Sequence, residues 1–234
     1  MQLNIKHINV LCGALLLWLS FSYTEIPNSV TIDKLQIDVD KYEVTIKQYL
    51  DFLNSSSHVT SFDNEGIRYE YDYEAKSWSE ISFNGSWKDY MKNLDDKLPV
   101  TMVSYTDACS YCESLGGRLP TDQEWNIYSG TEVIKGNIWH GIFPYRDYGN
   151  DGFSKTLSPV GSMIPLKNGL HDIYGNVWEY VQSESDAVIA KGGSFLCDFS
   201  MCSDTKRKGH LQVEKAERLQ SNIGFRCVYK QDTP

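Results

Sequence analysis

Two cysteines, Cys197 and Cys202, stand five positions apart in the segment KGGSFLCDFSMC and are the residues best suited to chemistry. They follow Gly192 and Gly193, and glycine lets a backbone pass close to another surface. The pair could form a metal site, because the thiolate of cysteine is a metal ligand. The pair could also be a reactive dithiol, or a local disulfide that adds little stability over so short a span. The residues alone leave these interpretations open.

Oxygen donors gather in two segments rich in glycine and aromatic residues. The first, NIWHGIFPYRDYGNDGF, offers the amides and carboxylates of Asn137, Asp147, Asn150 and Asp151. The second, GLHDIYGNVWEYV, places Asp172 and Glu179 on either side of a Gly-Asn turn. Ca²⁺ takes 6–8 oxygen ligands of these kinds. Turns rich in Asn and Asp are also common without a metal, so the spacing alone leaves calcium binding open.

Short elements are expected to position these segments. Alternating apolar residues from Val30 to Val39 predict one or two strands, and Thr45 is a candidate N-cap for a helix through Leu53. The run LPVTMVSY is strand-like, and Thr106 could cap the helix that follows. Residues 55–96 predict a surface loop with one hairpin, around Tyr69 to Tyr73 and Trp78 to Phe83.

The motif GGRLPTDQEW is expected to be structural rather than catalytic. Thr121 and Glu124 have the spacing of a capping box, in which each side chain satisfies a backbone amide at the start of a helix. The motif therefore predicts a hinge between two helices, and no chemistry is assigned to Arg118 or Glu124.

Composition limits the classes of function. The chain has 234 residues, of which 41% are hydrophobic, and its mean hydropathy is −0.40, which favours a single soluble domain over a polytopic membrane protein. Its net charge of −9 argues against nucleic acid as the partner, because phosphate binding needs a positive field. The basic cluster Lys206-Arg207-Lys208 is expected to be a solvated loop.

The N-terminus has the pattern of an export signal. Lys6 and His7 precede an apolar run from Val10 to Phe21, which is shorter than the roughly 20 residues that span a membrane. We expect residues 1–24 to be a signal peptide and residues 25–234 to form one domain, with a retained short anchor as the alternative. A secreted or periplasmic protein can form disulfides. The mature chain has five cysteines, so at least one thiol is unpaired.

Four motifs in order, GGRLPTDQEW, GLHDIYGNVWEY, KGGSF and NIGFRC, resemble the formylglycine-generating enzyme (sulfatase-modifying factor) family. The resemblance covers roughly residues 32–229 and is weakest across residues 55–96. It implies an α+β fold that is a variant of the C-type lectin-like fold, low in regular secondary structure.

The resemblance also implies an activity. Members of this family bind Cu(I) through two cysteines and use dioxygen to convert a cysteine in a CxPxR-type sulfatase peptide to formylglycine. Cys197 and Cys202 keep this spacing, and Ser194, Trp178 and Asn222 match active-site residues of the family. The partner would be an unfolded or extended cysteine-containing peptide, such as that of a sulfatase. The protein would act as a monomer, without nucleic acid and without stable membrane insertion after signal cleavage.

Two structural Ca²⁺ sites follow from the same resemblance. In the first, Asn137 and Asp151 supply side-chain oxygens while Ile138 and Phe153 supply backbone carbonyls. The second takes backbone ligands from Asp172, Gly175 and Val177 and a carboxylate from Glu179.

The family's disulfide between its first helix and GFRC implies that Cys112 pairs with Cys227. Cys109 is then the unpaired thiol, and we expect it to behave as a small, buried apolar residue.

The chain departs from the family just after Cys202. Catalytic members carry an aromatic and arginine-rich run there and a tyrosine before the second cysteine, whereas this chain has Met201 and then SDTKRKGHLQVEKAERLQ. The cations Lys206, Arg207, Arg218 and Arg226 remain in this neighbourhood, and most are expected to be solvated. The alternatives are a non-catalytic binding or accessory protein on the same lectin-like fold and a related oxidative tailoring enzyme with another substrate. An iron-dependent sulfoxide synthase is disfavoured because the five histidines lack an HxxxHxE-like spacing.

Overall fold

The computed structural model describes residues 28–131, 135–185, 187–202, 210–213 and 218–231. The predicted signal peptide and the cluster Lys206-Arg207-Lys208 lie outside these residues. The helices of the described part are α1 (Ile46–Ser55), α2 (Ser61–Glu65), α3 (Trp87–Met91), α4 (Tyr105–Ser114), α5 (Asp122–Tyr128) and α6 (Phe199–Cys202). None of them is long and apolar enough to cross a membrane.

The strands are short and form four small sheets. They are β1 (Ser29–Ile32), β2 (Ile37–Asp40), β3 (Ile67–Asp72), β4 (Ser77–Ser82), β5 (Gly141–Ile142), β6 (Arg146–Asp147), β7 (Trp178–Val181), β8 (Val188–Lys191), β9 (His210–Val213), β10 (Ile223–Gly224) and β11 (Val228–Lys230). Much of the described chain therefore runs outside helices and strands, as the resemblance implied.

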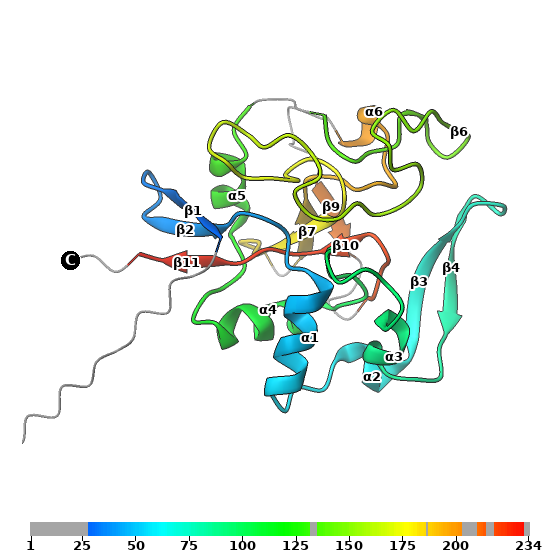
Figure 1. The fold of residues 1–234 in the computed structure, drawn as a ribbon, viewed down its shortest axis with the longest axis horizontal. Helices are drawn as coiled ribbons and strands as arrows, with labels where there is room; N and C mark the ends of the chain where they lie inside the picture. The colour runs from blue at the N-terminus through cyan, green and yellow to red at the C-terminus, as the bar shows by residue number, and fades with distance from the viewer. Residues whose placement is uncertain (1–27, 132–134, 186, 203–209, 214–217, 232–234) are drawn as a thin grey trace, which may run out of the picture.

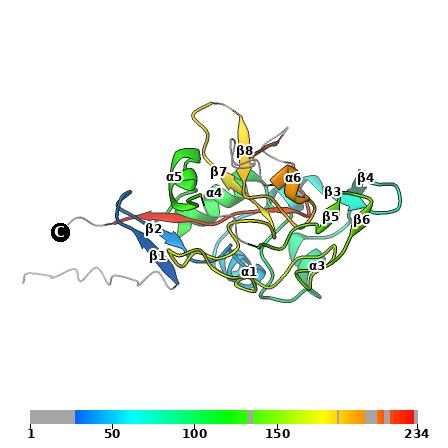
Figure 2. The same ribbon diagram turned by 90° about the horizontal axis from the view of Figure 1, so that it is seen from above.

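The sheets bring distant parts of the chain together. The order β1-β2-β11 places the first and last strands in one antiparallel sheet, and the order β10-β7-β8-β9 builds a second sheet in which β10 and β7 are parallel. Figures 1 and 2 show the β1-β2-β11 sheet at one end of the molecule and the hairpin β3–β4 at the other. In both views α6 lies beside the β5–β6 hairpin.

Capping residues explain where the helices begin. Thr45 and Thr121 form capping boxes with Gln48 and Glu124 at the starts of α1 and α5, which confirms both predictions. Arg118 pairs with Glu124 through two hydrogen bonds of 2.6 and 2.7 Å, so this motif is structural.

The predicted start of α4 is wrong by two positions. Its N-cap is Ser104 rather than Thr106, because the carboxylate of Asp107 sits three residues after Ser104 and accepts its backbone N–H. The run LPVTMVSY is not a regular strand. Met102 takes φ 55°, which interrupts the extended backbone, and single hydrogen bonds to Val44 and Gln220 replace a continuous ladder.

The segment 55–96 contains the predicted hairpin and two helices that we did not predict. Strands β3 and β4 pair with Tyr71 opposite Trp78. Helices α2 and α3 have five residues each and begin at capping boxes of Thr60 with Asp63 and of Ser86 with Asp89. The pattern Ser/Thr-x-x-Asp could have indicated where these two helices begin. Helices of five residues are too short to show apolar periodicity, so the sequence analysis missed them.

One disulfide ties the core together. Cys112 on α4 is bonded to Cys227, just before β11, as the resemblance implied. Around it, large aromatic side chains such as Tyr49, Trp87 and Phe225 are fully buried. Cys109 is the free cysteine of the described residues; it is half-buried, and burial raises the pKa of its thiol. Cys109 is therefore less buried than we expected.

Candidate functional site

The two cysteines lie at the ends of one tight turn. Cys197 precedes α6 and Cys202 ends it, and the backbone N–H of Cys202 donates to the carbonyl of Asp198 at 3.0 Å. Their Cα atoms are 6.0 Å apart, and the two sulfurs are joined in a disulfide. Both residues are buried, with 2% and 6% of their surface exposed. The turn therefore brings two thiol groups together in a protected position.

Gly193 fits closely against both sulfurs. A Cβ atom there would lie 2.7 Å from Sγ of Cys202 and 3.0 Å from Sγ of Cys197, and the residue has φ +88°. Any larger residue would enter the space of the sulfurs and be strained as well. This is the physical reason for a glycine at this point of KGGSF.

The predicted residues Ser194, Asn222 and Trp178 meet at the same place. The backbone N–H of Ser194 donates to Sγ of Cys197 at 3.2 Å, and its Oγ accepts from Nδ2 of Asn222 at 3.1 Å. The carbonyl of Asn222 accepts from the N–H of Trp178 at 2.9 Å, and Trp178 lies in the same buried cluster as both cysteines. The structure thus gathers all five predicted catalytic residues around the cysteine turn.

The first predicted calcium site has donors suited to the ion. Oδ1 of Asn137 is buried and has no hydrogen-bond partner among the described residues, while its Nδ2 donates to the carbonyl of Thr156 at 3.0 Å. The carboxylate of Asp151 is 2% exposed and accepts the backbone N–H groups of Ile138 and Phe153 at 3.2 and 2.9 Å. A buried amide oxygen left without a donor, beside a buried carboxylate, fits a cation that takes oxygen ligands.

The second predicted site touches the first. Gly175 has φ +91°, and a Cβ there would lie 2.3 Å from the carbonyl of Asn137, whose oxygen also accepts the N–H of Asn176 at 2.7 Å. Val177 is fully buried, and Oδ1 of Asp172 is buried without a hydrogen-bond partner among the described residues. We predicted a backbone contact from Asp172, and its side-chain oxygen is a further candidate donor.

The carboxylate of Glu179 already forms an ion pair with Arg226. Its two oxygens accept from Nη2 and Nε of Arg226 at 2.6 and 2.8 Å, and Oε2 also accepts from Nε1 of Trp125 at 3.1 Å. Arg226 is fully buried, so it is an exception to the expectation that most of these cations are solvated. It is held because the carboxylate of Glu179 and the carbonyls of Asp40 and His171 surround its guanidinium.

Glu43 is a buried carboxylate that the sequence analysis missed. Its Oε1 accepts the N–H of Val177 at 3.2 Å and its Oε2 accepts Nδ2 of Asn176 at 2.6 Å, so it holds the second loop in place. Burial, and then the charges of Asp172 and Glu179, raise the pKa of Glu43 well above its ordinary value. The raised pKa favours the neutral, protonated form of Glu43, which reduces the repulsion among these buried carboxylates.

No group of three or more His, Cys, Asp or Glu side chains converges as a metal site in the described part of the chain. Calcium ligation at either loop would therefore combine a single carboxylate, Asp151 or Glu179, with side-chain amide or backbone carbonyl oxygens, which is the kind of donor set that the resemblance implied.

Residues 7–231 match the family model described as Sulfatase-modifying factor enzyme 1-like domain. The chain belongs to this family. The curated relatives include proteins named as enzymes and proteins named as inactive. The chain is 28% identical over 247 residues to the formylglycine-generating enzyme of Thermomonospora curvata, an alignment covering 81% of this chain and 80% of that one. It is also 27% identical over 244 residues to the inactive C-alpha-formylglycine-generating enzyme 2 of Mus musculus, covering 88% and 78%.

A solved structure supports the sulfatase-modifying factor fold. PvdO from Pseudomonas aeruginosa superposes with a TM-score of 0.59 at 16% identity, covering 83% of this chain and 80% of that one. At this identity the likeness concerns the fold alone. Together with the family match it confirms the predicted fold class.

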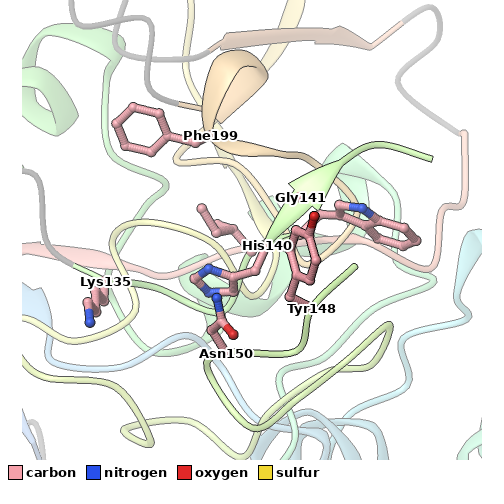
Figure 3. A pocket seen from close by; sticks show the side chains of 8 residues that line it. Lys135, His140, Gly141, Tyr148, Asn150 and Phe199 are labelled. Carbon is pink, nitrogen blue, oxygen red and sulfur yellow. The ribbon is translucent and has the colours of Figure 1, made fainter. Parts of the chain in front are cut away.

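A pocket of about 430 Å³ adjoins the cysteine turn of this sulfatase-modifying factor domain (Figure 3). Phe199 of α6 lines it together with residues of the loop that carries the first predicted calcium site, among them His140, Tyr148 and Asn150. Phe199 and Tyr148 are each 58% exposed. The pocket therefore offers an apolar, aromatic surface within two residues of Cys197.

Proposed function

We propose that this protein is a copper- and O₂-dependent oxidase that converts a peptidyl cysteine to formylglycine. The observation that carries the proposal is the pair Cys197 and Cys202, held in one turn with Gly193, Ser194 and Asn222 around the sulfurs. Relatives named formylglycine-generating enzymes support it at the level of the family.

In this proposal the thiolates of Cys197 and Cys202 hold Cu(I), and the residues fit because soft sulfur ligands select that ion. When bound, Cu(I) would supply a position for the substrate thiolate and the reaction with dioxygen. The N–H of Ser194 donates to Sγ of Cys197 and would stabilise its thiolate. Asn222 orients Ser194 through the Nδ2–Oγ hydrogen bond. The buried indole of Trp178 helps exclude water from this cluster.

The disulfide form of the pair has no thiolate to offer. An external thiol must therefore reduce it before the metal binds: two molecules of that thiol become one disulfide, and Cys197 and Cys202 become free thiols. The two predicted calcium sites would fix the loops at Asn137–Phe153 and Asp172–Glu179 and take no part in the oxidation.

The partner that suits this site is an extended polypeptide that presents a cysteine, as in a sulfatase. A secreted or periplasmic location accords with the disulfide Cys112–Cys227, since such bonds persist in oxidising compartments.

The second candidate is a non-catalytic binding protein on the same fold. Two observations favour it: the similarity to an inactive family member, and Met201 with the non-aromatic segment after Cys202.

One experiment separates the two functions. Reduced, copper-loaded protein is incubated under oxygen with a CxPxR peptide, and mass spectrometry follows the conversion of thiol to aldehyde. The proposal expects conversion by the wild type and none by Cys197→Ser. No conversion by demonstrably copper-loaded wild type would favour another substrate or the binding role.

A further inference from the structure

Asp198 lies inside the cysteine turn and divides its carboxylate between two parts of the structure. Oδ1 accepts from the N–H and Oγ of Ser200 at 3.0 and 2.6 Å and from the N–H of Met201 at 3.2 Å. Oδ2 accepts from the N–H of Phe143 at 3.0 Å, and Phe143 is 55 residues away in sequence. One side chain thus caps the turn that carries Cys202 and joins it to a separate loop.

The loop that contains Phe143 is held by aromatic packing. Phe143 packs against Trp139 and Tyr71 with ring centroids 5.1 Å apart in both cases. Trp139 in turn donates its backbone N–H to the carbonyl of Cys197 at 3.0 Å. The turn is therefore attached to residues 139–143 on both sides of the peptide bond between Cys197 and Asp198.

Asp198 is buried and held by several donors. The residue is 8% exposed, and its carboxylate accepts from Ser200, Phe143 and Met201. A carboxylate that accepts four hydrogen bonds has a fixed position, and it fixes the groups that donate to it.

We propose that Asp198 is a positioning residue, which keeps Cys202 against Cys197 by capping α6 and anchoring the turn to residues 139–143. The part of this inference that concerns copper rests on the proposed function. The part that concerns how closely the two thiols are held does not, because it applies to disulfide formation as well.

The test measures the equilibrium between Cys197–Cys202 and glutathione in the full protein, with thiol trapping and mass spectrometry of the peptides. In Asp198→Ala the equilibrium constant for forming this disulfide falls about tenfold or more, since the thiols are less closely held. Asp198→Asn keeps one acceptor oxygen, which cannot accept hydrogen bonds from both the turn and Phe143. The equilibrium constant for forming the disulfide therefore falls by an intermediate factor in this variant. Cys112–Cys227 is unchanged in each variant and is the internal reference.

Asp89→Ala is the matched control. It removes the carboxylate that caps the short helix α3 through Ser86, away from the cysteines, and leaves the equilibrium constant of Cys197–Cys202 unchanged. If the constant in Asp198→Ala and Asp198→Asn stays within twofold of the wild type, the proposal is wrong, whatever happens to the melting temperature.

Cu(I) affinity of the reduced proteins, measured by competition with a chromogenic chelator, is the second readout. We expect Asp198→Ala to bind about 10–100-fold more weakly than the wild type. If the wild type itself binds no Cu(I), the proposed function fails, and the disulfide measurement still decides the role of Asp198.

Discussion

The backbone nitrogen of Ser194 lies 3.2 Å from the sulfur of Cys197, to which its N–H donates. Nδ2 of Asn222 donates to Oγ of Ser194 at 3.1 Å and holds the serine in place. A donor aimed at a sulfur stabilises it most when the sulfur is a thiolate. This relationship explains why the cysteine turn, Ser194 and Asn222 form one unit, and it makes the site testable by single substitutions.

Gly193→Ala should disrupt the cysteine site. The new Cβ would lie 2.7 Å from Sγ of Cys202, and the alanine would have to adopt φ +88°, which is strained for a residue with a Cβ. We therefore expect Cu(I) affinity to fall about tenfold or more and the free energy of unfolding to fall by about 1–3 kcal/mol. Chelator competition and urea unfolding measure the two effects. Gly130→Ala is the control, because Gly130 has φ +66° but nothing lies within 4 Å of its Cβ position. An unchanged Cu(I) affinity in Gly193→Ala would contradict the geometry of the site.

Calcium should stabilise the protein through Asn137. Saturating Ca²⁺ is expected to raise the melting temperature by about 5–10 °C over protein in a chelator. Asn137→Ala removes the buried oxygen that lacks a donor and should reduce this rise by about half. Asn168→Ala, which loses a structural hydrogen bond to the carbonyl of Tyr128, should keep the full rise. Equal melting temperatures of the wild type with and without Ca²⁺ would exclude both sites.

Arg226→Met should be severely destabilising. It leaves the carboxylate of Glu179 buried without its cation, so we expect a loss of about 3–5 kcal/mol in the free energy of unfolding. Lys47→Met is the comparison, since Lys47 and Asp51 form an ion pair on the surface with side chains 56% and 59% exposed. That change should cost less than about 1 kcal/mol. Similar losses in the two variants would argue against a buried charge at Glu179.

Asp40 should give the stability a measurable pH dependence. Burial raises the pKa of Asp40 from 3.8 to about 6. The folded state therefore binds this proton more tightly than the unfolded state, and the contribution of Asp40 is fully present below about pH 3.8 and is lost as the pH rises through about 6. Asp40→Asn cannot ionise, so its stability relative to the wild type should increase between about pH 4 and pH 7.

Asp89→Asn should show the opposite trend. Hydrogen bonds from Ser86 lower the pKa of Asp89, so its contribution is present at neutral pH and is lost as the pH falls. Urea unfolding at a series of pH values measures both variants. Parallel pH profiles for Asp40→Asn and the wild type would show that Asp40 ionises normally in the folded protein.

Features encoded locally could be predicted from the sequence. The capping boxes at Thr45 and Thr121 depend on residues three positions apart, and the four ordered motifs led to the fold and to the group of Cys197, Ser194 and Asn222. The start of α4 was misplaced because Ser104 and Thr106 are both possible caps, and only the hydrogen bonds of Asp107 distinguish them.

Buried polar contacts between distant segments could not be predicted from one sequence, whereas the resemblance implied the distant disulfide Cys112–Cys227. Glu43 holds Asn176 across 133 positions, Arg226 holds Glu179 across 47, and Asp198 holds Phe143 across 55. Each is a polar residue that would ordinarily be exposed, and it is buried because the fold supplies partners from elsewhere. Periodicity and spacing carry no record of such partners.

The most direct test of the central claim is a Cu(I) titration of the reduced protein. We expect the wild type and Cys109→Ser to bind one Cu(I) tightly, and Cys197→Ser, Cys202→Ser and the double variant to lose this binding. Binding by the wild type no tighter than that of the double variant would contradict the assignment of Cys197 and Cys202 as copper ligands, and with it the proposed oxidase.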